Sequence, residues 1–253
     1  MPTPIRCTAL LALLPAVLAA GPSGGAGSGA PAWTTVLSAD FQAFGAEQSL
    51  VPGSAAEGRP ASIDPNLSVL VRDTPMASRS AQFSWIQVIG SGAVRFEFVD
   101  GAEPRTGVVS VRFDLHPQVP DRYSVFLREG DGAAQMFGDL LLNGTGTVRA
   151  NDSAGSTLLP WTWQPGRTYA LHWLYDLDAG TYDLRVDGRV LLAGRGHGID
   201  LSDPAQAGLG SVSFGLDNGA SANAVASFDN VLVRHAASIQ AEDVLFNAAF
   251  DPI

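Results

Sequence analysis

The sequence contains no lysine, so all 15 of its basic residues are arginines. With 25 acidic residues the formal net charge is −10, and charged residues make up only 16% of the chain. Nucleic-acid-binding surfaces need dense basic patches that replace the counterions of the phosphate backbone. The acidic balance therefore argues against DNA or RNA as a partner, and it disfavours polyanionic polysaccharides unless arginines cluster locally.

Cysteine is nearly absent as well, since Cys7 is the only one. It begins an apolar run over residues 7–20 that follows Arg6 and ends in small side chains. This order is typical of a secretory signal peptide, and the run is shorter than the roughly 20 apolar residues needed to span a bilayer. We expect a signal peptide over residues 1–20 and a flexible Gly/Ser/Ala-rich leader over 21–32, with cleavage at either end of that leader. The protein would then be secreted, to the periplasm or the extracellular space, without stable membrane insertion.

The expected mature chain has no cysteine and retains 14 basic and 25 acidic residues, for a net charge of −11. Disulfides therefore cannot stabilise it outside the cell, and its stability must come from a hydrophobic core or a bound metal. Hydrophobic residues make up 46% of the sequence, which is enough for a sizeable core. We predict one domain over residues 33–236, and we assign no structure to the extension over residues 237–253.

The clearest strand pattern lies in residues 163–192, where apolar and polar side chains alternate over two runs, 169–176 and 181–186. Turn sequences follow both runs, Asp178-Ala179-Gly180 after the first and Asp187-Gly188 after the second. Alternation with a period of two, interrupted by an Asp-Gly turn, indicates antiparallel neighbouring strands. This segment is therefore predicted to form a β-meander.

The same alternation recurs along most of the chain, at residues 34–42, 67–72, 81–88, 92–99, 107–116, 123–128, 134–142, 147–150, 209–216 and 225–234. No helical period is found before residue 236, and a Pro/Gly-rich stretch over 51–66 is predicted as an ordered surface loop. So many short strands with one apolar face require two packed sheets or a closed barrel. We favour an all-β, two-sheet antiparallel β-sandwich of the jelly-roll type, with the first and last strands side by side.

Three segments resemble the laminin-G-like branch of the concanavalin A-like lectin/glucanase jelly-roll family: Ala39-Asp40-Phe41, the segment that runs from Trp163 through Tyr182-Asp183-Leu184-Arg185-Val186-Asp187-Gly188, and the closing pair Gly208-Leu209-Gly210 and Phe228-Asp229-Asn230-Val231. Together, in this order, the three segments extend over nearly all of the expected mature chain, roughly residues 33–236. The resemblance implies a sandwich with a concave face, which in this family serves sugar binding, polysaccharide cleavage or no known role.

Two catalytic patterns of such relatives are missing from the chain. Similar glycanases carry a strand of the form E-x-D-x-x-E, whereas the acidic cluster after Glu97 runs from a strand into a turn. Similar lyases use a Tyr-x-Lys strand, and this chain has no lysine. A divergent polysaccharide lyase or glycoside hydrolase stays open, with Arg112, His116 and His172 as its catalytic candidates, because histidine can serve as base or acid.

A structural calcium ion is a further expectation. Asp229 lies inside an otherwise apolar strand, where a carboxylate needs a partner, and Asp40 follows the first strand. The resemblance implies calcium between these two strands, and oxygen ligands suit this hard cation. The alternative is that the carboxylates accept backbone N–H groups. No Cys/His cluster supports zinc.

The expected ligand-binding residues are of two kinds. Arg95, Arg112 and His172 point outward from their strands by the alternation. Trp161 and Trp163 share a face and form either a sugar-stacking platform or part of the core.

These observations favour a secreted, non-catalytic module that binds a polysaccharide or another cell-surface component. The divergent lyase or hydrolase and a purely structural or adhesive surface module are the alternatives. The sequence does not indicate an oligomeric state.

Overall fold

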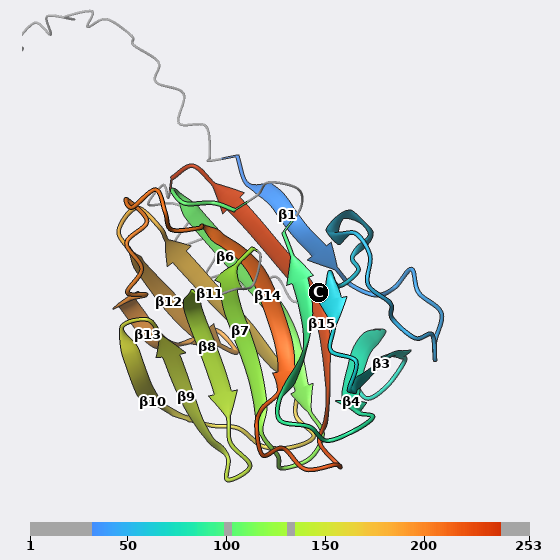
Figure 1. The fold of residues 1–253 in the computed structure, drawn as a ribbon. Helices are drawn as coiled ribbons and strands as arrows, with labels where there is room; N and C mark the ends of the chain where they lie inside the picture. Colours follow the sequence, from blue (N-terminus) through green and yellow to red (C-terminus); the bar gives the residue numbers. More distant parts are fainter. Residues whose placement is uncertain (1–31, 99–102, 131–134, 239–253) are drawn as a thin grey trace, which may run out of the picture.

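The computed structural model describes residues 32–98, 103–130 and 135–238. The predicted signal peptide, the leader up to residue 31 and the extension from residue 239 lie outside the described residues. Within them the chain forms two antiparallel sheets packed face to face, which confirms the predicted β-sandwich (Figure 1). The helical content of the described part is one 3-10 turn, η1 (Ala55–Glu57), and no helix there is long and apolar enough to cross a membrane.

The first sheet has eight strands in the order β13-β12-β11-β6-β15-β4-β3, with β1 also paired to β15. Their bounds are β1 (Thr34–Ala39), β3 (Leu67–Arg72), β4 (Ser80–Trp85), β6 (Val108–Pro117), β11 (Tyr169–Asp176), β12 (Thr181–Val186), β13 (Arg189–Gly196) and β15 (Val225–Ala236).

The second sheet has seven strands in the order β10-β9-β8-β7-β14-β5-β2. Their bounds are β2 (Ser62–Ile63), β5 (Gly92–Glu97), β7 (Tyr123–Glu129), β8 (Met136–Leu142), β9 (Thr147–Asp152), β10 (Gly155–Thr162) and β14 (Leu209–Leu216).

The first and last strands lie side by side, as predicted. β1 runs antiparallel to β15, with Ser38 opposite Leu232 and Ala39 opposite Val231. β4 pairs with the earlier part of β15, from Val225 to Phe228. The last strand therefore has neighbours along both flanks, and its backbone donors and acceptors are not left on an open sheet edge.

The predicted meander is also present, as β11, β12 and β13. Trp173 lies opposite Leu184 in the register of β11 and β12. The turn between β12 and β13 places Asp187 at φ 50° and Gly188 at φ 76°. Two successive residues with positive φ match the right-handed twist of the flanking strands, and Asp-Gly is a favoured pair for such a turn.

The core fills the space between the two sheets and is rich in aromatic rings. Phe214 of the seven-stranded sheet stacks on Phe228 of the eight-stranded sheet, with ring centroids 4.1 Å apart. On the same inner faces, Phe113 stacks against Trp173 at 5.8 Å. Because each strand turns alternate side chains inward, any ligand site must be built from the outward set.

Two strands were not recognised in the sequence. β2 lies within the stretch predicted as a loop and consists of two residues. β10 is an edge strand in which Leu159 is the buried apolar residue, so it lacks the alternation that identifies central strands.

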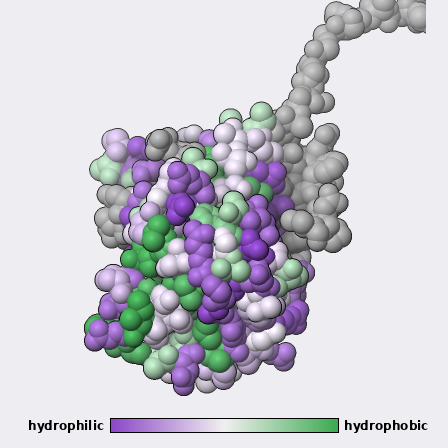
Figure 2. Space-filling view, turned by 90° about the vertical axis from the view of Figure 1, so that its right-hand side faces the viewer, coloured by the Kyte–Doolittle hydropathy of each residue, from purple (hydrophilic) through white to green (hydrophobic). Residues whose placement is uncertain are grey.

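The surface mixes hydrophilic and hydrophobic residues, as the side view in Figure 2 shows. Three exposed apolar side chains, Ile86, Val88 and Ile89, lie in the loop that leads from β4 to β5. That loop continues into Ser91 and Gly92, which line the cavity described next. Apolar surface therefore adjoins the site.

Candidate functional site

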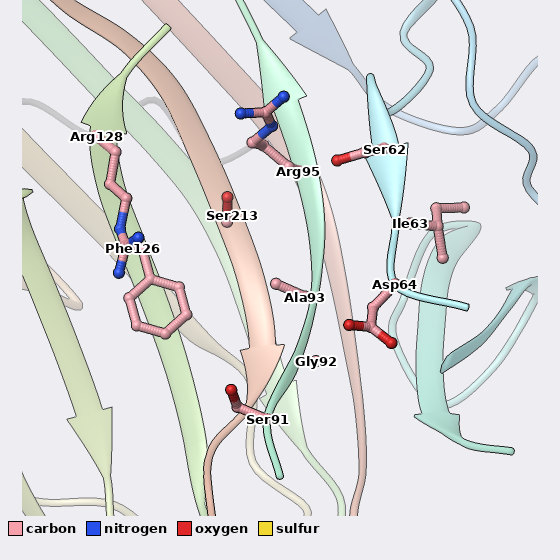
Figure 3. Close-up of a pocket in the computed structure, with 10 residues that line it drawn as sticks. All are labelled: Ser62, Ile63, Asp64, Ser91, Gly92, Ala93, Arg95, Phe126, Arg128 and Ser213. Atoms are coloured by element: carbon pink, nitrogen blue, oxygen red, sulfur yellow. The ribbon is translucent and has the colours of Figure 1, made fainter. Parts of the chain in front are cut away.

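A cavity of about 410 Å³ opens on the outer face of the seven-stranded sheet. We call it the β5/β7 cavity, because Arg95 of β5 and Phe126 and Arg128 of β7 lie on either side of it (Figure 3). Its lining consists of Ser62, Ile63, Asp64, Ser91, Gly92, Ala93, Arg95, Phe126, Arg128 and Ser213. Strands β2, β5, β7 and β14 and the loop residues Asp64 and Ser91 supply these side chains, so the tertiary fold is required to assemble the site.

The cavity belongs to a transverse row of outward side chains. Strand register places one residue from each of six neighbouring strands in line: Ser62, Arg95, Ser213, Phe126, Asp139 and Asn151. At about 4.8 Å per strand the row extends over roughly 24 Å. It offers hydroxyl, guanidinium, amide and carboxyl groups around one aromatic ring.

The two arginines of the cavity are held by neighbours on their own strands. Arg95 donates from Nη2 to Oε1 of Glu97 at 2.6 Å. The guanidinium of Arg128 lies over the ring of Phe126, 5.0 Å from its centroid. The Nε atoms of Arg95 and Arg128 are buried, and they have no hydrogen-bond partner within the described part of the chain. These contacts orient the arginines while other N–H groups can serve a ligand.

Asp139 gives this face a titratable group. Its Oδ2 accepts a hydrogen bond from Nδ2 of Asn151 at 2.9 Å, and its buried Oδ1 has no partner among the described residues. Burial raises the pKa of Asp139 to about 6, although the Asn151 hydrogen bond and the charge of Arg128 oppose the rise. Asp217 adds a smaller upward effect on the pKa. A carboxyl group in this state can hold or release a proton near neutral pH.

The predicted ligand residues divide between the two outer faces. Arg95 lines the β5/β7 cavity, whereas Arg112 and His172 lie on the outer face of the eight-stranded sheet, directly opposite each other in the register of β6 and β11. The structure therefore does not bring all three into one groove. Alternation had identified them correctly as outward residues, but it carries no information on which sheet each strand joins.

His172 is nearly inaccessible, with 1% of its surface exposed. Its Nε2 lies 3.0 Å from Oγ of Ser110. Burial lowers the pKa of His172 to about 3, and the charges of Arg112, Arg185 and Arg234 add to the effect. The imidazole is therefore neutral at ordinary pH and is a poor general acid there.

His116 lies on the same outer face but away from His172. It is four residues from Arg112 along β6, which corresponds to roughly 13 Å. Its Nδ1 lies 2.9 Å from Oγ1 of Thr168, and burial lowers its pKa. The three catalytic candidates thus include one adjacent pair, Arg112 and His172, and one distant member.

Both predicted tryptophans pack on the core. Trp163 is 2% exposed and donates from Nε1 to the carbonyl oxygen of Asn143 at 2.8 Å. The half-buried Trp161 contacts the ring of Tyr169 edge-on, with centroids 5.1 Å apart. These contacts fit the core alternative rather than an exposed stacking platform.

The predicted metal residues each have a partner. Oδ2 of the fully buried Asp229 accepts a hydrogen bond from Ser78, and Oδ1 of the exposed Asp40 accepts from the backbone N–H of Gln42 at 3.2 Å. Burial raises the pKa of Asp229 to about 6, with smaller contributions from the charges of Asp114 and Asp40.

The described residues contain no group of three or more His, Cys, Asp or Glu side chains able to hold a metal. The buried Oδ1 of Asp229 has no partner among them. These side chains alone do not form a calcium site, so calcium stays a prediction that requires additional ligands such as backbone carbonyls.

Several solved structures share this type of sandwich. A structure described as a sialidase matches with a TM-score of 0.55 and 15% identity over 79% of this chain, which spans 18% of that protein. The receptor-binding domain of botulinum neurotoxin C/D mosaic serotype matches with a TM-score of 0.52 and 10% identity, covering 85% of this chain and 50% of that one. The cellulose-induced protein Cip1 matches with a TM-score of 0.52 and 15% identity, covering 80% of this chain and 98% of that one.

No protein-family model and no curated protein matches the sequence. The structural matches establish a concanavalin A-like sandwich fold, which confirms the fold implied by the resemblance. Identities this low carry no activity or ligand from one protein to another.

Sequence reasoning missed Phe126, Arg128, Asp139 and Asn151. A signal was available for the first of them, since alternation in residues 123–128 places the aromatic Phe126 on the polar side of its strand. The alignment of Asp139 and Asn151 with Phe126 arises from the register of β7, β8 and β9 and could not be read locally.

Proposed function

We propose that this chain is a secreted, non-catalytic module that binds a glycan in the β5/β7 cavity. The observation that carries the proposal is the half-buried ring of Phe126 on the outer face of a sheet, between guanidinium and hydroxyl groups. Sugar rings combine apolar C–H faces with hydroxyl groups, so a site for them needs an aromatic surface with a few placed polar groups.

The transverse row supports an extended ligand rather than a single sugar. A linear chain lying across the strands could contact Arg95, Ser213 and Asn151 in turn, because these residues occupy the same row. Serine hydroxyls and amide groups can donate to and accept from sugar hydroxyls without a change of charge. A polysaccharide segment is therefore the ligand class that the surface fits.

The fold comparisons are compatible with this proposal. They include a protein described as a sialidase, a neurotoxin receptor-binding domain and a cellulose-induced protein. Of these descriptions, that of the neurotoxin domain names receptor binding, which is the kind of role proposed for this chain.

A glycan array probed with the mature full-length chain is the direct test. Binding of the best array ligand, measured by calorimetry, should weaken at least tenfold in Phe126→Ala, because the stacking surface is removed, and severalfold in Arg128→Gln. Arg167→Gln is the matched control, since that arginine forms an exposed ion pair with Asp187 elsewhere. Equal affinities in all variants would place the site elsewhere, and a blank array would favour the structural or adhesive module.

Catalysis is the second candidate function, and Asp139 is the observation that favours it. A carboxyl group with a pKa near 6, beside Arg128 and in line with Phe126, has the protonation behaviour of a general acid or base. Incubation of the chain with the bound polysaccharide should leave it intact if the module only binds. Shortened or unsaturated products that disappear in Asp139→Asn would show a hydrolase or lyase instead.

A further inference from the structure

One arginine of the β5/β7 cavity, Arg128, has no ion-pair partner among the described residues. Its side chain donates no hydrogen bond to any of them either, and of its nitrogen atoms only Nε is buried. The two Nη groups are therefore both accessible and unbonded within the described part of the chain. A half-buried guanidinium in this state costs free energy, which pairing with an anion would offset.

Arg167 shows the same kind of arginine with its partner in place. Arg128 lies over the ring of Phe126, and its guanidinium carbon is 5.0 Å from the ring centroid. Arg167 lies over the ring of Tyr169 at the same distance, 5.0 Å. However, Arg167 also donates from Nη2 to Oδ2 of Asp187 at 2.7 Å. Arg128 has the aromatic contact and lacks the carboxylate, so it can still accept an anionic group of a ligand.

The acidic side chains beside the cavity do not supply this anion. Glu97 is paired with Arg95 at 2.6 Å, so those two charges neutralise each other. Asp139 feels the charge of Arg128, which lowers its pKa, but burial has the larger, opposite effect on that pKa, and the two side chains form no ion pair. The cationic charge of Arg128 is therefore left to the cavity.

The two walls of the cavity differ in charge. Figure 3 shows Phe126 and Arg128 on the side of β7 and Asp64 beside β2, with Ala93 between them. An anionic group is attracted to the β7 wall and repelled by Asp64, whose carboxylate can instead accept hydrogen bonds from hydroxyl groups. A ligand that fits both walls carries a negative charge on one side of a ring and hydroxyl groups on the other.

We propose that the glycan bound in the β5/β7 cavity contains uronic acid, with its carboxylate on the Nη groups of Arg128 and its ring against Phe126. This ligand class rests on the proposed glycan-binding function. A uronic acid is a sugar ring with one carboxylate, and a guanidinium matches the planar carboxylate with two parallel N–H donors. Because Arg128 lies over the ring of Phe126, a sugar that packs against this ring is next to the cation.

A uronic acid within a chain fits the surface better than one at a chain end. The transverse row continues from Phe126 in both directions, to Arg95 on one side and to Asn151 on the other. Sugars on both sides of the uronic acid therefore meet protein. The net charge of −10 repels polyanions in general, so the acidic sugar has to be recognised locally, at Arg128.

Paired oligosaccharides test whether the carboxylate is recognised. Uronic-acid oligosaccharides that bind the mature chain on the array are compared by calorimetry with their carboxyl-reduced forms. Reduction keeps the linkages and replaces each carboxylate with a neutral hydroxymethyl group. The acidic form should bind severalfold to about tenfold more tightly, as expected for charge-assisted hydrogen bonds.

Three variants locate the effect. In Arg128→Gln the difference between the acidic and the reduced form should nearly disappear, and binding of the reduced form shows that this variant is folded. Arg128→Lys should retain part of the difference, because the charge stays while the planar pair of donors is lost. Arg167→Gln is the matched control, since it removes a ring-stacked arginine elsewhere, and it should leave the difference unchanged.

Failure of the ligand class is distinguishable from failure of the glycan site. Equal affinities for the acidic and reduced forms, both weakened by Phe126→Ala, would overturn the uronic-acid assignment and leave glycan binding in place. A preference for the acidic form that persists in Arg128→Gln would overturn it as well. Binding restricted to glycans with a terminal carboxylated sugar would contradict the placement within a chain. A blank array would overturn both the ligand class and the proposed function.

Discussion

Asp139 and His172 differ from the other outward polar residues because burial sets their protonation. Both lie on outer faces, yet burial favours the neutral acid in one case and the neutral imidazole in the other. Each therefore links folding stability to pH, and the two effects have opposite signs.

Asp139 should make the protein less stable as pH rises. Its pKa of about 6 lies above the ordinary value of 3.8. The contribution of Asp139 to folding stability is therefore fully present below pH 4 and is lost as the pH rises through 6. When the pH is raised from 4 to 7, the free energy of unfolding of Asp139→Asn should therefore increase relative to that of the wild type by up to about 3 kcal/mol. Urea unfolding of both proteins at these two pH values measures the gain, and the effect of Asp229, which shifts in the same direction, cancels in the comparison.

His172 should make the protein less stable as pH falls. Its pKa is about 3 in the fold against an ordinary value of 6.5, so its contribution is complete above pH 6.5 and declines below it. When the pH is lowered from 7 to 4, the free energy of unfolding of the wild type should fall by up to about 3 kcal/mol more than that of His172→Gln. Parallel pH profiles of the two proteins would mean that this imidazole titrates normally. Arg112, Arg185 and Arg234 are the charges that hold its pKa down together with burial.

At the scale of elements, register decides what each strand contributes. β7 supplies Phe126 and Arg128 to the cavity, while β8 and β9 extend the row to Asp139 and Asn151. A slip of one residue in β7 would turn these side chains into the core, so the packing of the inner face also maintains the site.

The turn between β12 and β13 offers a test of how firmly the meander is specified. Gly188 has φ 76°, a conformation that costs a residue with a branched side chain about 1–2 kcal/mol. Gly188→Val should reduce the free energy of unfolding by about that amount. Gly45→Ala should change it little, because the added methyl would meet Gln48 at an ordinary 3.6 Å. Thermal unfolding of both variants distinguishes conformational strain from simple crowding.

At the scale of the whole molecule, the pairing of β1 with β15 joins the first strand to the last within the eight-stranded sheet and brings Asp40 and Asp229 to one junction. The charge of Asp40 reaches Asp229 strongly enough to affect its pKa. An ion at this junction would link the first strand to the last, so its removal should destabilise the whole sandwich.

Calcium can be tested by removing it. If an ion bridges the first and last strands, EDTA should lower Tm by several degrees and added calcium should restore it, since binding to the folded state alone stabilises it by mass action. Asp229→Asn should abolish the difference. Coincident melting curves with and without EDTA would show that no calcium ion stabilises this junction.

The sequence by itself determined the fold class and most of the strands, because the alternation of apolar and polar side chains is a local pattern. It identified the inward residues of the meander and placed Arg95, Arg112 and His172 on outward faces. It also indicated that the first and last strands meet.

Only the tertiary structure decided which outward residues share a surface. Arg95 joined Phe126 and Arg128 on one sheet, while Arg112 and His172 joined Arg185 on the other. The physical reason is that strand pairing depends on contacts between segments far apart in the chain, whereas alternation reports only the two faces of each strand.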